Sequence, residues 1–194
     1  MRNASVKRET KETKVDVKLD IDGEGNSGIN TGVGFFDHML TLTAKHGLLD
    51  LHVNCNGDVE VDQHHSVEDV GIAFGQAFNE ALGNKEGINR YATITTPMDE
   101  ALSAISLDIS GRAFLVYHVE GLKEKVGAFD TELVEEFFLA FAKNANVTLH
   151  INLHYGRNTH HMIESIFKGF GSALDLASQK NGRIKGVPST KGTL

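Results

Sequence analysis

The feature that most constrains the fold of this chain is an internal duplication. A pattern of two histidines followed by a glutamate occurs in DQHHSVEDVG and again, 96 residues later, in THHMIESIFKGFG. The residues that recur are His64, His65 and Glu68 in the first copy and His160, His161 and Glu164 in the second. The same offset preserves apolar residues at helical spacing, so each copy is expected to begin an amphipathic helix of about 15 residues.

A second match, at an offset of 98 residues, aligns LHVN at 51–54 with LHIN at 149–152. Each half is therefore expected to contain a helix, a strand and then the His-His helix. The expected helices lie near 35–45 and 131–144, and the expected strands near 51–55 and 147–153. Polar and apolar residues that alternate predict further strands at 15–21, 91–96, 101–109 and 113–119. Clusters of Gly and Asn at 22–34 and 83–89 predict turns.

These elements predict an α+β protein made of two similar halves. Each half is expected to be a small, mostly antiparallel sheet with helices on one face, and the helix layers are expected to pack between the two sheets. We expect the first pseudo-repeat to span 1–86 and the second 87–180, within one compact domain. The polar, basic tail at 181–194 is expected either to be disordered or to become ordered on an anion.

Composition narrows the class of protein. No apolar run approaches the roughly 18 residues of a membrane span, and the polar N-terminus does not resemble a signal peptide. A single cysteine, Cys55, cannot form an intrachain disulfide, which fits a reducing compartment. We therefore expect a soluble, cytoplasmic protein without a membrane partner. The net charge of −7 argues against nucleic acid as a partner but permits a local basic pocket for a small anion.

The paired histidines predict a metal site. Residues four apart share a helix face, so His64 and Glu68, like their counterparts in the second copy, can offer a nitrogen and an oxygen to one ion. The second histidine of each pair points about 100° away, so each pair can serve two different metals, or one metal here and one on a facing element. Nitrogen and oxygen ligands without sulfur suit Mn(II), Fe(II) or Zn(II).

Two further residues are candidate ligands by the same logic. His38 lies in GVGFFDHML, and the offset of 98 places Glu136 at the equivalent position of the second half. If His38 binds metal in one half, Glu136 can supply the corresponding oxygen in the other; a solvated helix face is the alternative interpretation. The residues alone also leave open a dinuclear metallohydrolase and a metal that only holds an oligomer together.

Longer motifs resemble the imidazoleglycerol-phosphate dehydratases, which are enzymes of histidine biosynthesis. The motifs are RETKET at 8–13, TGVGFFDHML at 31–40, DQHHSVEDVGIAFG at 62–75, TLHINLHYGRNTHHMIESIFKGFG at 148–171 and PSTKG at 188–192. The resemblance implies a hydro-lyase that converts imidazole glycerol phosphate, a phosphorylated imidazole, to imidazole acetol phosphate. It also implies a duplicated fold akin to the second domain of ribosomal protein S5, two Mn(II) ions per active site at subunit contacts, and trimers assembled into a 24-subunit shell.

The resemblance also implies roles for individual residues. The metal ligands would be His38, His64, His65, Glu68, His160, His161 and Glu164, with Glu136 at a position where some family members have histidine. The substrate phosphate would be held by Arg90, Arg112, Lys168, Ser189 and Lys191. Such a cluster is what an acidic protein needs to bind a dianion. The general base would be Glu12 in RETKET, whereas Asp99 and Glu100, near Pro97, are assigned to a turn without a role.

Overall fold

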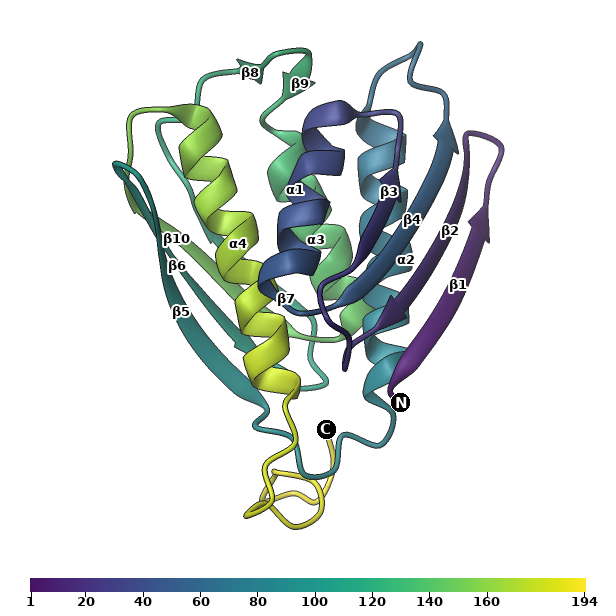
Figure 1. The fold of residues 1–194 in the computed structure, drawn as a ribbon, viewed down its shortest axis with the longest axis vertical. Coiled ribbons are helices and arrows are strands. Elements are labelled where there is room, and N and C mark those ends of the chain that lie inside the picture. Colours follow the sequence, from purple (N-terminus) through teal and green to yellow (C-terminus); the bar gives the residue numbers. More distant parts are fainter.

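Two four-stranded sheets form the outer layers of the molecule and four helices lie between them (Figure 1). The computed structural model describes residues 1–194. The first sheet has the order β1-β2-β4-β3 and the second the order β5-β6-β10-β7. The first sheet contains β1 (Asn3–Glu9), β2 (Thr13–Asp20), β3 (Ser27–Asn30) and β4 (Asp50–Gly57). The second contains β5 (Tyr91–Met98), β6 (Ala101–Asp108), β7 (Phe114–His118) and β10 (Thr148–Tyr155).

The helices are α1 (Gly34–His46), α2 (His64–Leu82), α3 (Leu133–Ala145) and α4 (Thr159–Ser178). A two-stranded hairpin, β8 (Lys125–Val126) with β9 (Phe129–Asp130), precedes α3. Each sheet has two antiparallel pairs and one parallel pair, β3 with β4 and β7 with β10. The equal strand order confirms the predicted α+β class and the mostly antiparallel, duplicated halves.

The helices fill the space between the sheets because each of them buries apolar side chains both against a sheet and against a helix of the other layer. In Figure 1, α1 and α2 cover the first sheet and α3 and α4 cover the second, while α2 packs on α3 and α1 on α4. Strand β2 buries Val15, Val17 and Leu19 toward the helices and leaves the residues between them more exposed. Phenylalanines join the two helix layers; the ring centroids of Phe74 in α2 and Phe141 in α3 lie 5.1 Å apart, edge to face. Full burial of such a side chain is worth about 1.5–3 kcal/mol.

In each His-His helix, the side chain two residues before the first histidine accepts a hydrogen bond from the backbone N–H of that histidine. The Asp62 carboxylate accepts a hydrogen bond of 2.8 Å from the backbone N–H of His64, and the Asn158 side chain accepts one of 2.9 Å from that of His160. Such caps satisfy backbone donors that have no partner within the helix. With 19 and 20 residues, α2 and α4 are longer than the predicted 15.

The predicted turn segment 22–34 is wrong in part, since it contains β3. Gly28 and Asn30 are poor strand formers, but Ile29 packs on the core and β3 pairs in parallel with β4. Tertiary contact therefore decides the conformation there. The boundary between 86 and 87 stays a prediction, and it falls between α2 and β5.

The C-terminal tail contains no helix or strand and folds back to the connection between the halves. The carbonyl of Gly186 accepts a hydrogen bond from Gly87, and that of Pro188 accepts one from the Arg90 guanidinium. None of the helices combines the length and apolar character needed to traverse a bilayer.

Candidate metal centre

Three predicted ligands meet where the start of α4 faces α1. His38, His160 and Glu164 form the only group of three or more such residues whose ligand atoms all lie within 4.8 Å of one another. Glu164 Oε2 is 3.2 Å from His160 Nε2 and 3.9 Å from His38 Nε2. Glu164 is 8% exposed, and an ionised carboxylate is rarely buried without a cationic partner. Two nitrogens and one oxygen without sulfur are a donor set that fits a divalent transition metal.

Lys168 lies one turn further along α4, on the same face. Its Nζ is 3.5 Å from the other carboxylate oxygen of Glu164. The prediction that Lys168 lies near the metal ligands is therefore consistent with its position, although it contacts a carboxylate here.

The equivalent trio of the first half is less compact. His64 Nε2 lies 3.9 Å from Glu68 Oε2 along one face of α2. Glu136, on the α3 helix that packs against α2, is half-buried and forms no ion pair. The structure of one subunit thus brings His38 to Glu164 but does not bring Glu136 to His64 and Glu68.

The second histidine of each pair is held by a carboxylate. His65 Nδ1 lies 3.0 and 3.1 Å from the two carboxylate oxygens of Asp58, and His161 Nδ1 lies 2.8 Å from Glu100 Oε2. These hydrogen bonds raise the pKa of both imidazoles. Hydrogen bonds lower the pKa of Glu100 to about 2. The bond from the His161 ring has the largest effect, and the backbone N–H groups of Asn158 and Arg157 have smaller effects.

The predicted base, Glu12, lies in the hairpin between β1 and β2. Its carboxylate is 3.7 Å from His65 Nε2, and its side chain is 54% exposed. The hairpin is attached to α2 by Asp69, which is 6% exposed and accepts hydrogen bonds from Arg8, at 2.9 Å, and from the Thr13 hydroxyl. A partly buried ion pair therefore fixes the segment that brings Glu12 to the histidines.

Four of the five predicted phosphate contacts lie at the other end of the helices, near the C-terminal tail (Figure 1). The backbone N–H of Arg90 bonds to the carbonyl of Ala177, which follows His161 by 16 residues of α4, or about 24 Å at 1.5 Å per residue. Arg90 also makes a two-pronged ion pair with Asp108, at 2.8 and 3.2 Å. The residues at this end are Arg90, Arg112, Ser189 and Lys191. Within one subunit they cannot reach a molecule bound at the histidines.

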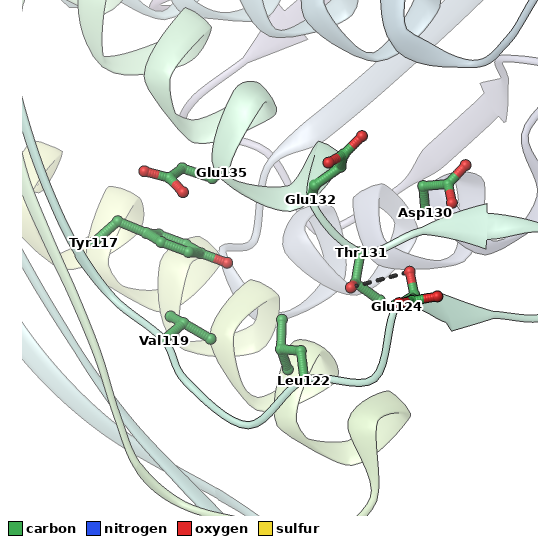
Figure 2. Close-up of a pocket in the computed structure, with 8 residues that line it drawn as sticks. All are labelled: Tyr117, Val119, Leu122, Glu124, Asp130, Thr131, Glu132 and Glu135. Atoms are coloured by element: carbon green, nitrogen blue, oxygen red, sulfur yellow. Dashed lines mark hydrogen bonds between the residues drawn. The ribbon is translucent and has the colours of Figure 1, made fainter.

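Two cavities flank the histidine end of the second half. The first, of about 490 Å³, is shown in Figure 2, with Tyr117 on one side, Thr131 on the other, and four carboxylates, those of Glu124, Asp130, Glu132 and Glu135, around it. This negative lining disfavours a phosphate.

The second cavity, of about 510 Å³, borders His160, His161 and Glu100. Its lining also includes three basic side chains, those of Lys123, Lys125 and Arg157, so its charge suits an anionic molecule better. None of these three was predicted from the sequence, because an isolated surface cation is far more often solvated than functional.

Comparison with known proteins decides the family. The family model described as imidazoleglycerol-phosphate dehydratase matches residues 31–174. The chain is 66% identical over its full length to the imidazoleglycerol-phosphate dehydratase of Oceanobacillus iheyensis, covering all of that protein, and 58% identical to that of Clostridium acetobutylicum, covering 98% of it. The chain belongs to the imidazoleglycerol-phosphate dehydratase family. It is therefore an enzyme of the hydro-lyase class.

Solved structures agree with this assignment. The crystal structure of imidazoleglycerol-phosphate dehydratase from Staphylococcus aureus superimposes with a TM-score of 0.84 at 45% identity, over 92% of this chain and 99% of that one. The enzyme from Pyrococcus furiosus gives the same TM-score of 0.84 at 34% identity, over 97% of this chain and 100% of that one. The imidazoleglycerol-phosphate dehydratase fold, with its duplicated halves, is thus confirmed. The matched segment 31–174 contains every predicted metal ligand, whereas Glu12 and the tail lie outside it.

Sequence reasoning missed Asp58, Asp62 and Glu100 as residues that support the site. One overlooked signal points to Glu100: a third offset, of 88 residues, aligns VKLDIDG at 17–23 with ISLDISG at 105–111 and also aligns Glu12 with Glu100. The strand registers agree, since Val17 pairs with Val53 and Ile105 with Ile151, and these partners are 98 residues apart. The turn predicted at Asp99 and Glu100 is present, but Glu100 does more than close it.

Proposed function

We propose that this protein removes water from imidazole glycerol phosphate to give imidazole acetol phosphate, in a manganese-dependent step of histidine biosynthesis. The observation that carries the proposal is a buried carboxylate between two histidines, Glu164 with His38 and His160, in a chain of the imidazoleglycerol-phosphate dehydratase family. The nitrogen and oxygen donors support Mn(II), although they also suit neighbouring divalent ions.

We further propose two Mn(II) ions per active site. The proposed ligands are His38, His64, His65, Glu68, His160, His161 and Glu164, with Glu136 as a candidate eighth. When bound, the ions would hold the imidazole ring of the substrate and stabilise charge that develops on it. The hydroxyl on the carbon attached to the ring departs, and the neighbouring carbon then loses a proton. Glu12 is the proposed base for that proton, because its exposed carboxylate lies beside His65. The enol so formed then tautomerises to the ketone.

The proposed phosphate contacts are Arg90, Arg112, Lys168, Ser189 and Lys191. Four of them lie about 24 Å along α4 from the histidines. A complete site would therefore take metal ligands from one subunit and phosphate contacts from another. This separation supports the proposed homo-oligomer, a 24-subunit shell of trimers. A cytoplasmic location is proposed from the single cysteine, Cys55, which is free and buried.

The test is the rate of ketone formation from imidazole glycerol phosphate by chelator-stripped protein, with and without added Mn(II). We expect no turnover without metal, restored turnover with it, and no release of inorganic phosphate. Release of phosphate would point to a metallohydrolase instead, and no ketone under either condition would end the proposal.

The variant Glu12→Gln tests the proposed base. A general base contributes about 10²- to 10⁴-fold in rate, so turnover should fall by that factor while the protein still binds Mn(II). Lys11→Gln, a change of charge at the neighbouring exposed residue, serves as the control. Unchanged turnover in Glu12→Gln would remove Glu12 from the role.

A further inference from the structure

The two carboxylates that hold His65 and His161 define which ring nitrogen is free. Asp58 contacts His65 Nδ1 through both oxygens, at 3.0 and 3.1 Å, and Glu100 contacts His161 Nδ1 at 2.8 Å. An ionised carboxylate can only accept hydrogen bonds, so Nδ1 must carry the proton in both rings. In the neutral imidazole, Nε2 then carries the lone pair, which is the form that a metal ion requires.

Glu100 is held in place more firmly than a typical surface glutamate. Besides His161, it accepts hydrogen bonds from the backbone N–H groups of Arg157, at 3.0 Å, and Asn158, at 2.7 Å. These groups begin the turn that leads into α4. Glu100 thus fixes both the orientation of the imidazole and the start of the helix that carries it.

The two halves use different residues to bind a carboxylate to Nδ1 of the second histidine of each pair. The offset of 88 makes Glu12 the equivalent of Glu100, and the offset of 98, extended from β4 and β10 into the loops that follow, places Gly156 opposite Asp58. Gly156 has no side chain, and in the second half it is Glu100 that binds His161 Nδ1. In the first half Asp58 occupies His65 Nδ1, and the Glu12 carboxylate accepts no hydrogen bond and stays 54% exposed.

We propose that Asp58 and Glu100 are positioning residues that direct Nε2 of His65 and His161 toward metal, and that Asp58 leaves Glu12 free to meet the substrate. The inference rests on the proposed function in one respect, namely that these two histidines are metal ligands. It adds a division of roles between two equivalent glutamates, one fixed to a histidine and one free.

The decisive variant is Glu100→Gln in the full-length protein. Its side-chain oxygen can still accept from Arg157 and Asn158, but its amide group would then face His161 Nδ1 and donate to it. That contact favours the proton on Nε2 and removes the lone pair offered to the metal. Removal of such a supporting partner typically weakens metal binding by 10- to 100-fold. We expect that loss for one class of Mn(II) sites, measured by calorimetry on chelator-stripped protein at a temperature at which the variant is still folded in chelator.

The first half offers a second variant and a matched control. Asp58→Ala should weaken Mn(II) binding by a similar factor, whereas Asp58→Asn should do so less, because an asparagine can turn its oxygen toward Nδ1. Glu60→Ala removes an exposed carboxylate from the same loop without a hydrogen bond or ion pair, and it should bind Mn(II) as the wild type does.

The division of roles has its own readout. At saturating Mn(II), Glu100→Gln should regain most of its turnover, whereas Glu12→Gln should bind Mn(II) normally and regain none. Wild-type affinity for Mn(II) in both Glu100→Gln and Asp58→Ala would overturn the positioning role. Recovery of Glu12→Gln by added Mn(II) would overturn the division of roles. Because the affinities are measured without substrate, a wild type that binds Mn(II) but forms no ketone would end only the proposed function.

Discussion

The crossing of α1 and α4 provides a sharp test of how closely the two halves must pack. A Cβ atom added to Gly171 would overlap the backbone oxygen of Thr43 and lie 3.1 Å from the backbone nitrogen of Gly47. Both neighbours are backbone atoms, so no change of rotamer relieves the overlap. The Gly171→Ala substitution must therefore push the two helices apart.

The expected magnitude follows from two opposing contributions. Overpacking of a well-packed core costs about 1–3 kcal/mol, and a backbone clash belongs at the upper end. Replacement of glycine by alanine inside a helix recovers about 1 kcal/mol. We therefore expect Gly171→Ala to lower the free energy of unfolding by about 2 kcal/mol. For a chain of this size, each kcal/mol shifts the unfolding temperature by roughly 2–4 °C.

Thermal and urea unfolding should be compared at one protein concentration and in chelator, because any association of subunits and any bound metal would add to the apparent stability. Gly34→Ala is the control, since a Cβ there meets nothing within 4 Å; it should be neutral or stabilising by up to about 1 kcal/mol. Gly75→Ala, at the crossing of α2 and α3, would meet Phe141 O at 2.6 Å and should lose as much as Gly171→Ala. Wild-type stability in Gly171→Ala would refute the reasoning.

Two further outcomes are expected. Asp69→Asn should lower the free energy of unfolding by about 2 kcal/mol in urea unfolding, because it weakens a charge-assisted hydrogen bond to Arg8; equal stability would show that the buried pair does not fix the hairpin. Glu100 has a folded pKa of about 2 against an ordinary value of 4.5, so its contribution is complete above about pH 4.5 and is lost as the pH falls toward 2. In chelator, the free energy of unfolding of Glu100→Gln should therefore fall less than that of the wild type as the pH is lowered across this range. Parallel plots of the free energy of unfolding against pH for the two proteins would contradict the assignment.

Local sequence patterns were sufficient for the four helices and for six of the ten strands, and they suggested the first candidate ligands. The helix that starts at His64 and its copy were predicted because apolar spacing and the repeat are both local signals. Strand β3 was missed because Gly28 and Asn30 hide the alternation, and only pairing with β4 stabilises it. The role of Glu100 was missed because no local pattern links it to His161, 61 residues away, and because the offset of 88 residues that aligns it with Glu12 was overlooked.

The position of most of the predicted phosphate contacts was likewise beyond the sequence. Helical spacing places Lys168 one turn from Glu164 on the same face of α4. No local pattern shows that Arg90 lies at the far end of that helix, because its position depends on how the strands pack and how the tail folds.

That separation has a consequence in genetic terms. If a catalytic site is completed by two subunits, as proposed, a chain with a damaged histidine end and a chain with a damaged arginine end are each inactive alone. An assembly that mixes them contains some sites in which the intact ends of both chains meet. Alleles such as His161→Ala and Arg112→Ala would then fall into two classes, and co-expression of one allele from each class would restore growth without histidine, whereas two alleles of one class would not.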